Sequence, residues 1–247
     1  MRKMVIALLL ALLPAVVWAS EGGGNFMKPD LDPTDTASLQ RGAKLFANYC
    51  MGCHSLKYLR YKRMAEDLDI PESVVEDDLI WDGSKIHEHM MSAMPAGKAN
   101  DWFGKTPPDL SLTVRQRGAD WVYTYLNTFY RDDKSSTGVN NLVLPGASMP
   151  HVLWRLQGVP EPVYEEVNAG TPDAHLVVTD VKVPEKAGAM SEKEYHEATN
   201  DLVNFLAYAA EPIKAERQRL GVWVILFLLV FLGIAYMLKR EYWKDVH

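Results

Sequence analysis

The sequence predicts a mostly α-helical domain with long loops, exported from the cytoplasm and held by one C-terminal transmembrane helix. A short apolar segment behind a basic start opens the chain, and an uncharged apolar segment of 19 residues lies near its end. Between them, apolar residues recur at the three- and four-residue steps of a helix. The net charge of −6 over 247 residues argues against a nucleic-acid-binding protein, which needs a basic face.

The N-terminal segment has the three parts of a secretory signal peptide. Residues 1–3 form a basic start, residues 4–18 an apolar core, and residues 17–19 a site for cleavage after Ala19. A short buried helix of the mature fold is the less favoured alternative, because an acidic residue and three glycines follow without a helical pattern. We therefore expect residues 1–19 to be removed and the domain at 20–219 to be exported to the periplasm.

A helix is predicted immediately before the two cysteines of the chain. Gly42 would let another backbone approach this helix closely, and Thr36 or Ser38 is expected to cap its N-terminus. Its apolar face consists of residues three or four positions apart, Leu39, Ala43, Phe46 and Tyr49.

Both cysteines belong to the motif Cys50-Met51-Gly52-Cys53-His54, whose C-x-x-C-H spacing attaches a c-type haem. Two thiols on one helical turn can form thioethers with the two vinyl groups of a porphyrin, and the adjacent imidazole can bind the iron. A thioredoxin-like pair would follow a strand in a βαβ pattern, and a zinc site would need further ligands. The motif therefore predicts a cytochrome c-type haem domain with one covalently bound haem c.

The second axial ligand of the iron stays open at this point. Methionine or histidine usually takes this position, and methionine raises the reduction potential. Met149 lies in an irregular loop bounded by prolines, which suits a fixed side chain outside a helix. Met94 is an equal candidate from spacing alone, and His87 or His89 comes third.

The stretch from 55 to 190 is expected to be mostly loops, with one short strand at 177–183 where polar and β-branched residues alternate. A long helix follows at 191–210, and Ser191 and Glu194 form a capping box at its start. The first and last helices cross in haem c folds. The side chains expected at that crossing are Phe46, Tyr49, Phe205 and Tyr208.

Residues 220–238 are predicted to span a membrane. A helix of this length extends ~28 Å, close to the ~30 Å hydrocarbon core of a bilayer. Trp223 lies near one end and Tyr236 near the other, as in an interfacial aromatic belt. Because the large domain is exported, residues 239–247 are expected to stay in the cytoplasm, and one helix cannot line a transport pathway.

The chain resembles the cytochrome c1 family, the haem c subunits of the cytochrome bc1 complex. The C-x-x-C-H motif alone names no family, but three further stretches together are specific: the sequence PPDLS, a loop ending in Met-Pro, and the sequence DLVNFLAYAAEP. The matching stretches cover most of the mature chain and lie at 50–58, 107–111, 117–122, 140–150 and 201–212.

The resemblance implies a role for each site residue. Cys50, Cys53 and His54 would hold the haem, with Met149 as the second axial ligand of the iron and Met94 as a structural residue. Arg117 would face a haem propionate, where a guanidinium can pair with a carboxylate, although an ordinary surface charge is the alternative. Pro108 or its neighbour would offer a backbone carbonyl to the His54 ring.

The resemblance also implies an electron-transfer subunit of a ubiquinol–cytochrome c reductase. Electrons would pass from the Rieske iron–sulfur protein through the haem to a soluble cytochrome c, beside a cytochrome b subunit, in a dimer of the whole complex. The chain would cross the bacterial inner membrane once, keep its haem domain on the periplasmic side and make no bonds itself. The alternatives are a freestanding membrane-anchored cytochrome c that serves an oxidase or peroxidase, and a haem-based gas sensor.

Residues 66–78 contain seven acidic residues and no Lys or Arg. Such a run is usually a solvated face, which is the interpretation slightly favoured here. In an electron donor it would also steer a basic cytochrome c, and association would then weaken as salt rises.

Overall fold

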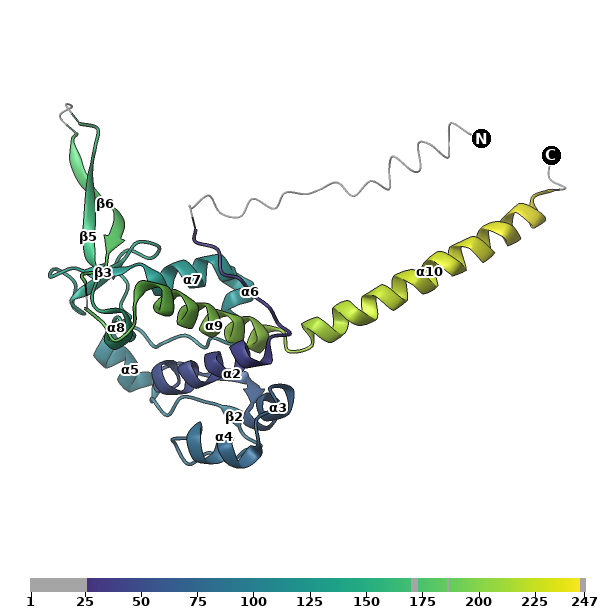
Figure 1. Ribbon diagram of the computed structural model, residues 1–247, viewed down its shortest axis with the longest axis horizontal. Helices are drawn as coiled ribbons and strands as arrows, with labels where there is room; N and C mark the ends of the chain where they lie inside the picture. The colour runs from purple at the N-terminus through teal and green to yellow at the C-terminus, as the bar shows by residue number, and fades with distance from the viewer. Residues whose placement is uncertain (1–25, 170–172, 186, 245–247) are drawn as a thin grey trace.

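The computed structural model describes residues 26–169, 173–185 and 187–244, so the predicted signal peptide at 1–19 lies outside the described residues. Helices make up most of the regular structure, which confirms the predicted class (Figure 1). The helices are α2 (Thr36–Leu45), the π-helix η1 (Phe46–Cys50), α3 (Tyr61–Asp67), α4 (Glu72–Asp78), α5 (Ala96–Phe103), α6 (Thr113–Arg117), α7 (Ala119–Asn127), α8 (Trp154–Gln157), α9 (Glu192–Ala210) and α10 (Lys214–Tyr242).

The stretch from 55 to 190 is more ordered than the sequence suggests, because short helices and three antiparallel strand pairs interrupt its loops. The strand expected at 177–183 is present as β6 and starts two residues earlier, and it pairs along its length with β5 in a hairpin. The pairs are β1 (Leu56–Arg60) with β2 (His89–Met90), β3 (Phe129–Arg131) with β4 (Val139–Asn141), and β5 (Glu161–Val167) with β6 (His175–Lys182).

The core is organised around the contact between α2 and α9, which lie side by side in Figure 1. Gly42 makes this contact close: a Cβ atom there would lie 2.1 Å from the Asp201 carbonyl oxygen and 2.6 Å from the Phe205 Cβ. The rings of Phe46 and Phe205 meet at 5.8 Å, so the predicted helix crossing is confirmed. Arg41 adds a two-pronged ion pair to Asp201, with its Nε 2.6 Å from Oδ2.

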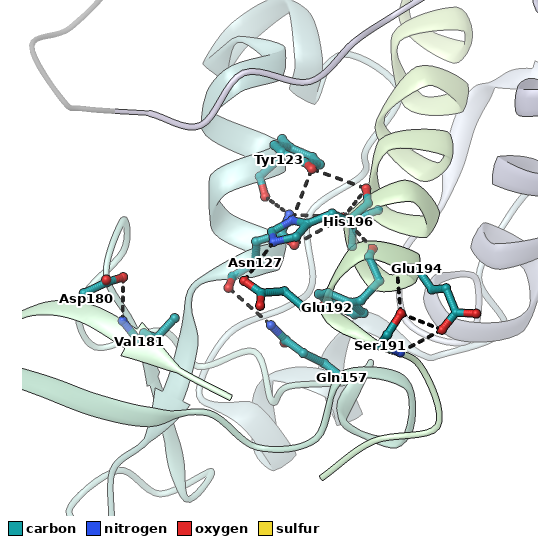
Figure 2. Close-up of polar contacts among 11 residues, drawn as sticks. Tyr123, Asn127, Gln157, Asp180, Val181, Ser191, Glu192, Glu194 and His196 are labelled. Atoms are coloured by element: carbon teal, nitrogen blue, oxygen red, sulfur yellow. Dashed lines mark hydrogen bonds and ion pairs between the residues drawn. The ribbon is translucent and has the colours of Figure 1, made fainter. Parts of the chain in front are cut away.

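The helix caps follow from local polar side chains. Asp35, and not Thr36 or Ser38, caps α2: its carboxylate accepts a hydrogen bond from the Ser38 backbone N–H at 3.0 Å. The prediction failed because Asp35, Thr36 and Ser38 are all residue types that cap helices, and only the backbone conformation decides which one precedes the first turn. The capping box of α9 is confirmed and is drawn in Figure 2. The Glu194 N–H donates to the Ser191 hydroxyl, and the Glu194 carboxylate accepts from the Ser191 N–H.

Helix α7 is fastened to α9 by buried polar contacts (Figure 2). The Tyr123 hydroxyl lies 3.2 Å from the His196 ring, and the Asn127 amide donates to the Thr199 hydroxyl at 3.1 Å. The Tyr195 hydroxyl donates to the Leu126 carbonyl at 2.8 Å. Because buried polar groups are costly when unpaired, these bonds fix the position of α7 along α9.

Helix α10 projects away from the rest of the domain (Figure 1), and its apolar side chains are exposed along its length. Among the described helices it is the one long and apolar enough to cross a membrane. Its 29 residues extend beyond the predicted span at both ends, and they correspond to ~43 Å, the thickness of a bilayer with its headgroups. An ion pair of 2.6 Å between Arg217 and Glu211 ties its start to the end of α9.

Replacing Gly42 by Ala is expected to destabilise the domain by about 3 kcal/mol, because the new methyl group would meet a backbone carbonyl that cannot move away alone. The thermal midpoint of the detergent-solubilised chain should then fall by roughly 6 to 12 °C. Gly97→Ala is the matched control, since Gly97 is also helical and a Cβ atom there would meet nothing within 4 Å. Equal midpoints for the two variants would contradict the close contact.

Candidate haem site

The C-x-x-C-H residues form one tight helical turn. The His54 backbone N–H donates to the Cys50 carbonyl at 2.8 Å, and the Cys53 N–H donates to the same carbonyl at 3.0 Å. This turn places the two sulfur atoms on consecutive levels of one helix face and the histidine directly after them. Such an arrangement fits a porphyrin held by two thioethers and one imidazole.

The π-helix η1 delivers Cys50 to this turn. The Met51 N–H donates to the Phe46 carbonyl, five residues earlier, at 2.9 Å. Each turn of η1 therefore contains about one more residue than a turn of the α-helix α2. Phe46 is fully buried against α9, whereas Tyr49, also expected in the core, is half-buried. The buried Tyr61 hydroxyl donates to the Met51 sulfur at 3.3 Å and so fixes the side chain in the middle of the motif.

The two thiols are unsuited to redox or zinc chemistry as thiolates. Burial raises the pKa of Cys50 to about 12, and the neighbouring Cys53 contributes in the same direction. Burial also raises the pKa of Cys53. Because the thiolate is the reactive and metal-binding form, these environments disfavour a thioredoxin-like pair. Among the described residues, no group of three or more His, Cys, Asp and Glu side chains could hold a metal ion.

His54 is buried and fixed through one ring nitrogen. Its Nδ1 lies 2.7 Å from the Pro108 carbonyl, and since a carbonyl only accepts, Nδ1 carries the proton and Nε2 is left to bind a metal. Burial lowers the pKa of His54, and the Pro108 carbonyl and Asp109 oppose this shift. The ring is therefore neutral at physiological pH, as an iron ligand must be.

Asp109 was not singled out by the sequence analysis, yet it shapes the segment that carries the Pro108 carbonyl. Its carboxylate accepts from the Lys57 N–H at 2.9 Å and from the Ser111 N–H at 3.0 Å. The available signal was the Asp two positions before a serine in a proline-bounded turn, the usual pattern of an Asx turn.

Met149 lies away from the motif in sequence and packs against a second buried cluster, formed by Tyr125, Phe129, Val139 and Ala147. Its loop is supported by α7 and by the β3–β4 pair, which are different elements from those around His54. A methionine held by a separately supported loop could bind the iron together with His54.

The other candidate ligands lie next to the C-x-x-C-H motif and the β1–β2 pair. The Met94 N–H bonds to the Ser92 hydroxyl, which in turn donates to the Gly52 carbonyl inside the motif. His89 lies in β2, the partner strand of β1, and His87 is exposed with its carbonyl bonded to the Arg60 guanidinium. These placements favour Met149 over Met94, His87 and His89.

Arg117 ends α6 and is exposed, with its guanidinium 5.1 Å from the centre of the Trp121 ring. Trp121 stacks on Tyr125 at 5.2 Å, and Tyr125 meets Phe129 edge-on at 5.0 Å. This row was missed by the sequence analysis, although the four residues recur at every fourth position. Since Trp121 and Met149 both pack on the second cluster, the row places Arg117 near the methionine loop.

The acidic residues at 66–78 lie on α3, on α4 and in the turn between them, and they are exposed. Asp67 is used internally, since it pairs with Arg63 at 2.6 Å and accepts from the Tyr208 hydroxyl at 2.8 Å. Lys62 reaches Glu72 at 3.4 Å. These partners support the interpretation of the run as a solvated face whose charges are partly paired.

The chemistry available at the C-x-x-C-H turn is that of a c-type cytochrome, and α10 makes it a membrane-anchored one. Residues 27–246 match the Cytochrome C1 family. The chain belongs to this family and is a haem-bearing electron-transfer subunit of the cytochrome bc1 complex, with a covalently bound haem c. That complex is an oxidoreductase, the ubiquinol–cytochrome c reductase.

Individual relatives match the whole length of the chain. Cytochrome c1 of Allochromatium vinosum is 47% identical over 247 residues, with both chains fully covered. The ammonia monooxygenase gamma subunit of Nitrosomonas europaea is 42% identical, over 99% of this chain and 100% of the relative. Cytochrome c1 of Rhodospirillum rubrum is 25% identical, over 99% of this chain and 97% of the relative.

Proposed function

We propose that the chain accepts electrons from a Rieske iron–sulfur protein and passes them to a soluble cytochrome c on the periplasmic side of a bacterial inner membrane. The observation that carries the proposal is the buried C-x-x-C-H turn with a neutral, fixed His54, in a chain that continues directly into a membrane-spanning helix. When bound, haem c supplies a one-electron carrier. The residues of the chain hold and shield this carrier, and no bond-making step takes place on them.

In this proposal Cys50 and Cys53 would hold the haem covalently, and His54 and Met149 would bind its iron. The Pro108 carbonyl fixes the tautomer of His54 and strengthens its donation to the iron. The apolar cluster around Met149 would keep water away from the Met149 sulfur. A methionine ligand places the reduction potential high enough to accept an electron from a Rieske centre.

Arg117 is proposed to pair with a haem propionate. Its guanidinium is exposed and lies over Trp121, which joins the cluster that supports Met149. A guanidinium held in this way keeps its donors free for a carboxylate, and Arg is the residue type that binds a carboxylate through two parallel bonds.

The proposed topology follows from the two apolar segments. Residues 1–19 are removed after export, residues 20–219 form the periplasmic haem domain, residues 220–238 cross the bilayer, and residues 239–247 remain in the cytoplasm. The exposed apolar surface of α10 then contacts lipid and the cytochrome b subunit, and two copies of the complex form a dimer.

Replacing Met149 by Leu is expected to remove the second axial ligand. The reduced haem should then bind carbon monoxide, and the reduction potential should fall, because methionine ligation raises it. Absorption spectra of the reduced protein with and without carbon monoxide measure this directly. Met94→Leu is the matched control. A Met-ligated spectrum that survives in Met149→Leu would overturn the ligand assignment.

Arg117→Gln is expected to lower the haem potential by tens of millivolts, on the order of 1 kcal/mol, because removal of a positive charge disfavours the added electron. Arg115→Gln is the matched control, since Arg115 is also exposed in the last turn of α6. A redox titration of both variants decides the role. Equal shifts would mean that Arg117 is an ordinary surface charge.

The proposed electron path is tested by gentle solubilisation of membranes and purification through a tag on this chain. We expect c-type and b-type haem bands together in the reduced-minus-oxidised spectrum, and quinol-driven reduction of added cytochrome c. A c-type band alone, without quinol activity, would contradict the proposal and favour a freestanding shuttle. Copurification with an oxygenase in place of a b-type cytochrome would instead favour the association named for the Nitrosomonas europaea relative.

A further inference from the structure

We propose that His151 is a positioning residue that fixes Met149 by fastening the end of its loop to the β3–β4 strand pair. The inference deepens the proposed function, since it rests on Met149 as an iron ligand. A thioether is neutral, so no charge attracts it to the metal. How strongly the Met149 sulfur binds the iron therefore depends on how well the loop holds this side chain in position beforehand.

The loop at 142–150 leaves β4 and consists of turns and bends. Its beginning is held by Asn141, which is fully buried. The side-chain Oδ1 of Asn141 accepts from the Val143 and Leu144 N–H groups at 2.9 and 3.3 Å, and its side-chain Nδ2 donates to the Tyr125 carbonyl at 2.8 Å. These bonds attach the start of the loop to α7.

The end of the loop is held by His151, which is 4% exposed. Its ring stacks on Phe129 with centroids 5.1 Å apart and planes 14° from parallel. Its Nε2 lies 3.1 Å from the Gly158 carbonyl, and because a carbonyl only accepts, this nitrogen carries the proton. One side chain thus makes both a ring contact and a hydrogen bond.

The two fastenings meet at one place. Phe129 of β3 is the direct partner of Asn141 of β4, so the ring under His151 belongs to the residue opposite the first anchor. The loop therefore leaves and returns to the same strand pair, in the manner of a closed surface loop whose ends are fixed. Met149 lies two residues before the second anchor and packs on the same cluster.

Both contacts of His151 are expected to matter for the ligand. Phenylalanine at this position would keep the stacked ring and lose the donor, leaving the Gly158 carbonyl unpaired in a buried site. Glutamine would keep a donor nitrogen. A residue with a purely structural role would change the thermal stability of the domain without changing how firmly the thioether holds the iron.

The test uses the full-length, haem-loaded chain in membranes and measures the carbon monoxide-binding fraction of reduced haem, with the haem potential and thermal midpoint recorded in parallel. We expect His151→Phe to raise the dissociation constant of the Met149 thioether from the iron about tenfold, as the loss of one buried hydrogen bond predicts. Carbon monoxide binding to the reduced haem reports this change. The potential should fall, and His151→Gln should restore much of both. His175→Phe is the matched control, since the His175 ring is also hydrogen-bonded to a backbone carbonyl, that of Asp173, but it is exposed on β6.

Met149→Leu separates the two levels of the inference. If it binds carbon monoxide and His151→Phe does not, the ligand assignment stands and the positioning role is wrong. If Met149→Leu itself keeps an inert, Met-ligated haem, the proposed ligand and the positioning role both fail. Should His151→Phe not accumulate, Phe129→Leu removes the stacked partner instead, and an unchanged carbon monoxide response in that variant overturns the proposal.

Discussion

The close contact between α2 and α9 is the constraint on which the rest of the structure depends. It is possible because Gly42 has no Cβ atom where the backbone of α9 passes. Phe46, locked against Phe205, then starts the π-helical turn that leads into the C-x-x-C-H motif. The turn from Cys50 to His54 is held by its own backbone hydrogen bonds, so the packing of α2 on α9 sets where the whole turn lies in the core.

The proposed ligands come from two walls that are built differently. The wall of His54 is local: β1, β2 and the segment around Asp109 bond directly to the residues of the motif. The wall of Met149 is assembled from α7 and the β3–β4 pair, far from the motif in sequence. Buried α7–α9 hydrogen bonds connect the two walls, because α9 also packs on α2. The distance between the ligands is thus decided by helix packing.

The outer parts of the chain expose apolar side chains to the surroundings of the domain. The apolar side chains of α10 are exposed along a helix long enough to cross a bilayer. Exposing such an apolar surface to water is unfavourable, as is typical of a surface that contacts a membrane or another protein. The β5–β6 hairpin projects from the opposite side of the domain (Figure 1) and exposes Tyr164 and Leu176. The buried core between these parts holds the haem-binding residues.

The sequence by itself determined the elements whose signals are local. The covalent haem motif, the α9 capping box and the membrane-spanning segment depend on neighbouring residues, so periodicity, spacing and residue type were sufficient to predict them. Gly42 indicated that another backbone could approach closely, and the structure shows that this backbone is α9 at Asp201. Only the tertiary structure decided which polar residue caps α2, which candidate methionine stands on a separate wall, and that Asp109, Asn141 and His151 shape the site. These depend on contacts between residues distant in sequence, whose free energy exists only once helices and strands have packed together.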